Sequence, residues 1–289
     1  MTRTTARPAA PDVHALGEGP VWDPARQRLL WVDIVAGVVH EGALDAATGE
    51  ITPTARHTFG TTVGAVAVAE DGELIVAEQA VLTRVDLAGR RTELARVLPP
   101  GRRSRLNDGA VDPAGRFLVG SLPQDDRQGE EVLVRLDGER VTVLDADLTV
   151  SNGLAWSPAG DVLYSVDTAS GVVWARRYDP ADGATGTREQ AFTVTEGKPD
   201  GMCADAEGNL WVANWGLGRV EHRTPSGELL GTIETGAPHT SSVCFAGPAL
   251  DTLVITTAVQ GPAEPGPASG RLFTARADVP GLPLPYWRP

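Results

Sequence analysis

The chain has 289 residues, of which 42% are hydrophobic, enough for one large β domain or two smaller domains. Frequent glycine and proline, 33 and 22 residues, favour many turns and few long helices. The formal net charge of −13 argues against binding to nucleic acids or to anionic membrane surfaces.

The two cysteines, Cys203 and Cys244, lie in apolar runs and do not make a disulfide framework in a chain of this length. The N-terminus carries arginines but no apolar segment typical of a signal peptide. No apolar run approaches the length of a membrane span. We therefore expect a cytoplasmic protein that does not bind membranes.

A strand, a polar turn and a second strand recur along the chain. The first strands of six such copies begin at Gly19, Ala65, Asp108, Gly153, Gly201 and Ser241. Their last residues are spaced by 46, 43, 45, 48 and 40 residues. A period near 45 with several strands per repeat is typical of a β-propeller. We predict an all-β, six-bladed propeller with four-stranded antiparallel blades, because a two-sheet sandwich does not explain six copies.

The sixth copy has one candidate outer strand, residues 270–276. Residues 12–16 belong to no repeat, and we expect them to supply the missing outer strand and close the ring, which hides sheet edges. The predicted organisation is a single domain, residues 1–289, with a flexible N-terminus at 1–11 and a C-terminal tail at 278–289.

Equivalent positions of the innermost strands lie at equal heights around a propeller's channel. Five residues before the end of each first strand stand Glu18, Gly64, Asn107, Asn152, Asp200 and Thr240. Asp and Asn also begin strands for local reasons, but four acids or amides at one offset predict a ring of oxygen donors. Such a ring suits a hard divalent cation, and the absence of His and Cys disfavours structural zinc. Glycine follows three of these positions, and we expect it to keep the channel mouth open.

Several stretches carry a resemblance to a known family. In chain order they include Gly17-Glu18-Gly19-Pro20, Arg105-Leu106-Asn107-Asp108-Gly109, Ser151-Asn152-Gly153 and Pro199-Asp200-Gly201. Over residues 14–276 the sequence resembles the regucalcin/gluconolactonase family, whose best-known activity is the hydrolysis of sugar lactones. The resemblance implies a single divalent metal held by Glu18, Asn152 and Asp200, with Asn107 and Arg105 contacting substrate. Where animal members have a Glu in the substrate pocket, this chain has Gln124, which leaves the identity of the sugar open.

We therefore expect a lactonase, monomeric or weakly dimeric, that opens a sugar lactone or a similar small cyclic ester. The metal, which the oxygen ligands allow to be Ca, Zn, Mn, Mg or Fe, would polarise the carbonyl or a bound water. Asp200 would act as metal ligand and general base, or as ligand alone. Two alternatives stay open: a phosphotriesterase-type hydrolase, and a non-enzymatic metal-binding regulatory or interaction protein.

Polar residues also end the second strands on the same face of the predicted propeller. They are Asp33, Asp167, Asn214 and Trp215. We expect them to support their neighbours rather than bind a ligand. His239, beside Thr240, is interpreted as a solvated loop histidine and not as a ligand.

Overall fold

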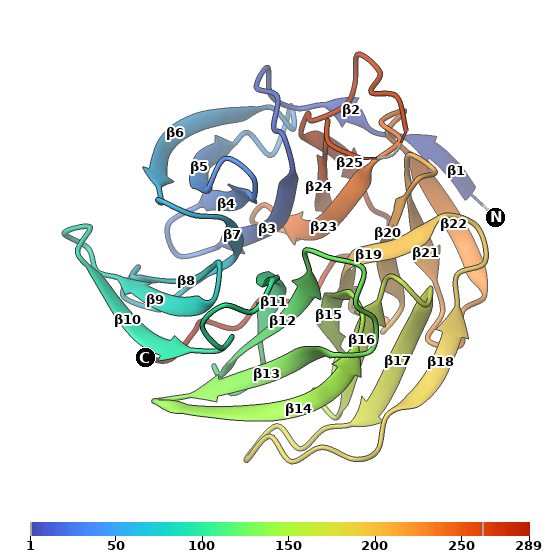
Figure 1. Cartoon of the computed structure of the whole chain (residues 1–289). Coiled ribbons are helices and arrows are strands. Elements are labelled where there is room, and N and C mark those ends of the chain that lie inside the picture. The colour runs from blue at the N-terminus through green and yellow to red at the C-terminus, as the bar shows by residue number, and fades with distance from the viewer. Residues whose placement is uncertain (1, 262) are drawn as a thin grey trace.

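The computed structural model describes residues 2–261 and 263–289, and its regular structure there consists of strands alone. Six sheets stand in a ring around a central channel (Figure 1). Within each blade, consecutive strands of the repeat pair antiparallel, and the first strand lies innermost. The predicted six-bladed propeller is confirmed. Within the described residues, no helix has the length and apolar character needed to cross a membrane.

The strands of the first three blades follow one another along the chain. They are β3 (Gly17–Asp23), β4 (Arg28–Asp33), β5 (Val38–Leu44) and β6 (Ile51–Thr58); β7 (Val63–Val68), β8 (Leu74–Glu78), β9 (Val81–Val85) and β10 (Arg91–Arg96); β11 (Ser104–Val111), β12 (Phe117–Pro123), β13 (Glu131–Asp137) and β14 (Arg140–Leu148).

The other three blades repeat this order, except that the N-terminus joins the last two. Their strands are β15 (Ser151–Trp156), β16 (Val162–Asp167), β17 (Val172–Arg177) and β18 (Glu189–Thr193); β19 (Lys198–Ala204), β20 (Leu210–Trp215), β21 (Arg219–Arg223), β22 (Leu229–Glu234) and β1 (Thr2–Thr5); β23 (Thr240–Ala246), β24 (Thr252–Thr257), β25 (Phe273–Arg276) and β2 (Arg7–Pro8).

The N-terminal segment closes the ring, but not through the residues that we expected. The short strand β2 pairs antiparallel with β25 and completes the sixth blade, whereas residues 12–16 make only an isolated bridge from Leu16 to Ala258. The strand β1 adds a fifth, parallel strand outside β22. Residues 2–5 and 7–8 therefore form strands within the segment 1–11 for which we predicted a flexible N-terminus; residue 1 lies outside the described residues.

Apolar side chains fill the space between neighbouring blades. One cluster joins Leu30 and Val32 of β4 to Val66 and Val76 of the second blade, and all four are almost fully buried. Such burial on both faces explains why the second strand of each repeat reads as a mainly apolar run. We call the face where the innermost strands begin the upper face, and the opposite one the lower face.

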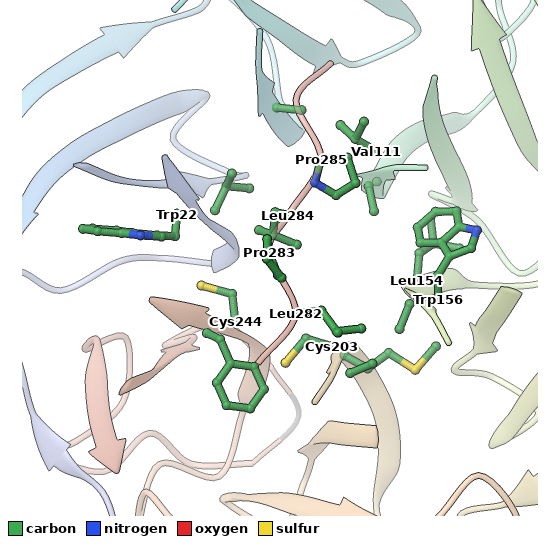
Figure 2. A pocket seen from close by; sticks show the side chains of 18 of the residues that line it. Trp22, Val111, Leu154, Trp156, Cys203, Cys244, Leu282, Pro283, Leu284 and Pro285 are labelled. Carbon is green, nitrogen blue, oxygen red and sulfur yellow. The ribbon is translucent and has the colours of Figure 1, made fainter. Parts of the chain in front are cut away.

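The C-terminal tail crosses the lower face of the channel. At one side of the ring, the backbone N–H of Leu282 donates a hydrogen bond to the carbonyl of Ala204 at the end of β19. On the opposite side, the backbone N–H of Trp287 donates to the Val68 carbonyl at 2.8 Å. Between the tail and the inner strands lies a cavity of about 370 Å³. Figure 2 shows the tail running between Trp22 on one side and Trp156 on the other. The lower end of the channel is therefore covered by the chain itself.

Candidate functional site

The predicted ring of polar residues lies at an irregularity that all six innermost strands share. In every blade the pairing of the first and second strands shifts register near the upper end. Such a bulge turns a side chain away from the regular alternation of the sheet. Each of the six ring residues lies at or directly beside the shift. The four polar members Glu18, Asn107, Asn152 and Asp200 are only 4–6% exposed.

Two of the glycines that follow ring residues, Gly153 and Gly201, lie where adjacent innermost strands are in close contact. A Cβ on Gly153 would lie 2.4 Å from the carbonyl oxygen of Asp200, and one on Gly201 would lie 2.1 Å from Ser242 Oγ. Glycine at these positions lets adjacent innermost strands approach each other. Close packing of adjacent strands therefore accounts for glycine at these two positions, whereas a Cβ on Gly19 would meet only the Gly64 carbonyl oxygen at 4.0 Å.

Three carboxyl groups share one buried region of the channel. Burial, and then the charges of Asp200 and Asp108, raise the pKa of Glu18 well above its usual value. Burial and Asp108 act in the same way on the pKa of Asp200. Burial also raises the pKa of Asp108 to about 6. Arg105 is the cation that opposes them, and its own burial lowers its pKa to about 10 despite the attraction of Glu18 and Asp200.

Two of the buried ring side chains have an oxygen atom for which the described part of the chain offers no hydrogen-bond partner. The two atoms are Asn152 Oδ1 and Asp200 Oδ1. The Asn152 amide is oriented by Thr168, whose Oγ1 accepts a bond from Asn152 Nδ2 at 3.1 Å and donates to the Pro199 carbonyl at 2.8 Å. Glu18 Oε2 accepts the N–H of Gly19 at 3.1 Å. Unsatisfied buried acceptors of this kind are costly unless a donor or a cation meets them.

These donors fit a hard cation. Among residues 2–261 and 263–289, no group of three His, Cys, Asp or Glu side chains is placed to hold a metal. A metal here would therefore need the neutral oxygen of Asn152 together with the two acids Glu18 and Asp200. Carboxylate and amide oxygens are the ligands that hard divalent cations take.

The predicted substrate contacts Arg105 and Asn107 are joined to each other and to the next blade. Arg105 Nη1 donates to Asn107 Oδ1 at 2.6 Å, and Asn107 Nδ2 donates to the Ser151 carbonyl at 2.9 Å. The third predicted contact, Gln124, lies just beyond β12 and is exposed. Its Oε1 accepts a bond from Gln79 Nε2 at 2.9 Å.

The polar residues at the ends of the second strands support the loops that lead to the ring. Asp33 accepts the N–H groups of Ala15 and Leu16, and Asp167 accepts those of Thr149 and Val150. In the fifth blade, Asn214 donates to the carbonyl of Glu196 at 2.9 Å. The residues held in this way precede Glu18, Asn152 and Asp200 by two to four positions, as the supporting role predicted for Asp33, Asp167 and Asn214 requires.

His239 differs from its prediction as a solvated residue. It is fully buried, its ring lies 4.5 Å from that of Trp215, and its Nε2 accepts the N–H of Ala263 at 3.2 Å. Burial lowers its pKa. His239 and Trp215 therefore pack together under the loop that follows β24.

The lower cavity shares little with this polar region. Asp108 and Gly19 border both, but the remaining lining is mainly apolar and includes Cys203 and Cys244 (Figure 2). Both cysteines are free, and burial raises the pKa of each thiol. Glu18, Asn152 and Asp200 are not among the residues that line this cavity, so the candidate site is the upper channel.

Sequence reasoning missed three residues of this region. Asp108 follows Asn107 in a quoted motif, and its acidic side chain was the available signal. Thr168 and Gln79 gave no such signal, because their hydrogen bonds are made to residues distant in the sequence. Thr168 bonds to Asn152 and Pro199, and Gln79 bonds to Ser104 and Gln124.

Comparisons with known proteins agree with this architecture. The SMP-30/gluconolactonase/LRE-like region matches residues 16–259. The chain is 36% identical to a 6-deoxy-6-sulfogluconolactonase of Pseudomonas putida and 34% identical to a pentonolactonase of Haloferax volcanii, with 94% of each chain covered in both pairs. The crystal structure of a calcium-binding protein, regucalcin, from Agrobacterium tumefaciens superimposes with a TM-score of 0.91 at 28% identity, covering 99% of this chain and 98% of that one. The chain therefore belongs to the SMP-30/gluconolactonase/LRE-like family.

Proposed function

We propose that this protein is a metal-dependent lactonase that opens a sugar lactone in the upper channel. The supporting observation is the pair of buried, unpartnered oxygens of Asn152 and Asp200 beside Glu18. Relatives named as lactonases, at 36% and 34% identity over nearly the whole chain, supply the reaction class.

The charges of the site favour a divalent cation as its cofactor. When ionised, Glu18, Asp108 and Asp200 carry three negative charges, and Arg105 returns one positive charge. The remaining charge of −2 matches a divalent ion. We assign its binding to Glu18, Asn152 and Asp200. When bound, such an ion would act as a Lewis acid toward a carbonyl and lower the pKa of a coordinated water.

The proposed reaction uses Asp200 as the base. Its carboxylate takes a proton from the attacking water as the oxygen bonds to the lactone carbonyl carbon. The ring C–O bond then breaks, and the proton passes to the leaving oxygen, giving the open hydroxy acid. We assign to Arg105 the role of donating hydrogen bonds to substrate oxygens; its Nη1 donates to Asn107 Oδ1 at 2.6 Å, which supports the orientation of the guanidinium.

A metal-depletion experiment tests this function. Purified protein is stripped with a chelator, reloaded with each of Ca, Mg, Mn, Zn and Fe, and assayed on a panel of aldonolactones by acid release. We expect the stripped protein to be inactive and at least one ion to restore hydrolysis. Equal activity with and without metal would refute the metal role. No opening of any lactone, with phosphotriesters assayed in parallel, would refute the lactonase assignment.

A further inference from the structure

The lower cavity has the size of a small-molecule site. Its volume of about 370 Å³ falls within the range of roughly 300–1,000 Å³ that is typical of ligand pockets. The innermost strands of all six blades contribute to its walls, and residues 282–286, which we call the strap, cover its lower side. The cavity is therefore enclosed by strands of the ring and by one crossing segment.

Aromatic and aliphatic side chains make up most of the lining. Trp22 of β3, Trp156 of β15 and Phe245 of β23 border the space from three different blades (Figure 2). Leu154 and Met202 add aliphatic surface. Aromatic rings prefer edge-to-face or offset contacts with other rings, so this lining suits an aromatic ligand.

Most hydroxyl groups at the cavity already have partners. The Ser157 hydroxyl donates to Asp161 at 2.7 Å, and the Tyr286 hydroxyl donates to Asp23 at 2.9 Å. A buried water needs about two to four hydrogen-bond partners, so water in the lower part of the cavity is poorly held. Replacing such water with an apolar molecule favours binding.

The charge around the cavity favours a neutral ligand. Among the described lining residues, Asp108 is the one charged side chain, and it lies next to the acids Glu18 and Asp200 of the upper channel. An anion would be repelled there, because no cationic side chain of the described residues lines the cavity. An ammonium ion would have one carboxylate and otherwise apolar surroundings, which is costly.

The strap is fixed at its ends and free of backbone bonds in its middle. The backbone N–H groups of Gly281 and Trp287 hold the two ends, each through a hydrogen bond of 2.8 Å. Pro283 and Pro285 have no N–H to donate, and Leu284 between them makes no backbone hydrogen bond to the described residues. The sequence Leu-Pro-Leu-Pro therefore crosses the channel without joining a sheet.

The middle of the strap also borders free space on more than one side. A second cavity of about 240 Å³ is lined by Pro283 and Leu284, which line the larger cavity as well. The Leu284 side chain is 37% exposed. This part of the strap can therefore move without displacing closely packed neighbours.

We propose that the lower cavity binds a neutral aromatic molecule of about two fused rings, and that the strap is the gate through which this molecule enters. A dry cavity of roughly 150 Å³ already holds benzene, so the larger volume here accommodates a second ring. The inference goes beyond the proposed lactonase function and does not depend on it, since Glu18, Asn152 and Asp200 do not line the cavity.

Calorimetric titration of the purified protein with 2-naphthol tests the site. The matched ligand is 2-naphthoate, which has the same two rings and a negative charge. We expect 2-naphthol to bind with a Kd on the order of 100 µM, as its small size allows. The anion should bind at least about tenfold more weakly, because like charges oppose it.

A substitution that fills the cavity locates the bound probe. Ala110 lines the cavity and is half-buried, so the ring of Ala110→Phe would occupy space that the probe needs. This variant should bind 2-naphthol at least about tenfold more weakly. Ala88→Phe, at an exposed position between β9 and β10, is the control and should bind as wild type does. If Ala110→Phe does not fold, Cys203→Phe narrows the same cavity.

Tyr286→Phe tests the gate. It removes the hydrogen bonds that the Tyr286 hydroxyl makes with Asp23 at 2.9 Å and with the N–H of Ala25 at 3.1 Å. Association and dissociation of 2-naphthol, followed by stopped-flow fluorescence, should both become several-fold faster while Kd stays the same. Unchanged rates would refute the role of the strap.

Three results would overturn the binding site itself. They are no binding of 2-naphthol to wild type, equal binding of 2-naphthoate, and undiminished binding by the folded cavity-filling variant, which would place the probe elsewhere. None of them bears on the lactonase assignment, which the metal-depletion assay tests separately.

Discussion

Thr168 connects two candidate metal ligands. Its hydroxyl accepts a bond from Asn152 Nδ2 and donates to the carbonyl of Pro199, the residue before Asp200. Residues that orient metal ligands in this way typically contribute 10- to 100-fold to metal affinity. Thr168→Val should therefore bind a divalent cation about tenfold more weakly.

Calorimetric titration of metal into metal-free protein measures this effect. Thr193→Val, at an exposed position of the outer strand β18, is the matched control. Unchanged affinity in Thr168→Val would mean that Asn152 does not depend on its hydroxyl for orientation.

At the scale of single residues, the sequence repeat identified the polar residues of the channel but not the residues that orient them. Counting back along six repeats singled out Glu18, Asn107, Asn152 and Asp200, and all four are buried in the channel. The count could not include Thr168, because its importance comes from a hydrogen bond to another loop. Nor could it show the joint electrostatics of the acids, which depend on burial.

Among the elements, the close contact of β15 and β19 depends on Gly153. A methyl group there would lie 2.4 Å from the Asp200 carbonyl, so one strand must move. We expect Gly153→Ala to lower the free energy of unfolding by about 2 kcal/mol, as overpacking typically does, and to weaken metal binding as well.

Urea denaturation compared with Gly60→Ala checks this prediction. A Cβ on Gly60 would meet no atom of residues 2–261 and 263–289 within 4 Å, so that variant should be nearly as stable as wild type. Equal stability of the two variants would contradict the proposed close contact.

In the first blade, His40 of β5 stacks on Trp31 of β4 with ring centroids 5.2 Å apart. Burial and then His14 lower the pKa of His40 to about 4, although Asp33 and Asp12 oppose this change. Between pH 6.5 and 4 the unfolded chain binds a proton that the folded chain does not, so stability is full above that range and decreases as the pH falls.

Lowering the pH from 7 to 5 should therefore cost wild type about 1 kcal/mol more than His40→Phe, which keeps the stack without titrating. Urea denaturation of both proteins at the two pH values measures the difference. A parallel decline of the two proteins would show that His40 does not contribute to the pH dependence.

The irregular parts of the strands could not be predicted. Apolar runs gave the inner strands and their order, because both faces of these strands are buried. Glycine follows each of Glu18, Asn152 and Asp200, but this pattern did not by itself indicate the register shifts there, since a bulge is a property of the pairing and not of one strand.

For the whole molecule, closure by the N-terminus joins the two ends of the ring. Removing residues 2–8 would uncover β22 and β25, whose partners they provide. This truncation should lower Tm and increase aggregation, because exposed strand edges pair with other chains. Thermal unfolding and light scattering measure both effects.

Arg3→Ala is the control for this truncation. It removes only a surface ion pair with Glu234, in which the arginine is 75% exposed, and such pairs contribute little. A truncated protein with an unchanged Tm would indicate that the ring does not depend on these strands.

The strand that closes the ring shows why the need for an N-terminal strand could be predicted but the residues that form it could not. Six copies with one strand missing required a contribution from the N-terminus, and the structure has one. The strand involved, Arg7–Pro8, is only two residues long and is fixed by backbone pairing with Phe273 and Thr274, so it has no alternation to recognise.

The most direct test of the central proposal is the rate of lactone opening by Asp200→Asn. The amide keeps the size of the side chain but removes the charge that binds metal and accepts a proton. With metal at saturating concentration and folding verified, kcat for an aldonolactone should fall at least about 100-fold. A variant that retains wild-type kcat would contradict the proposed role of Asp200.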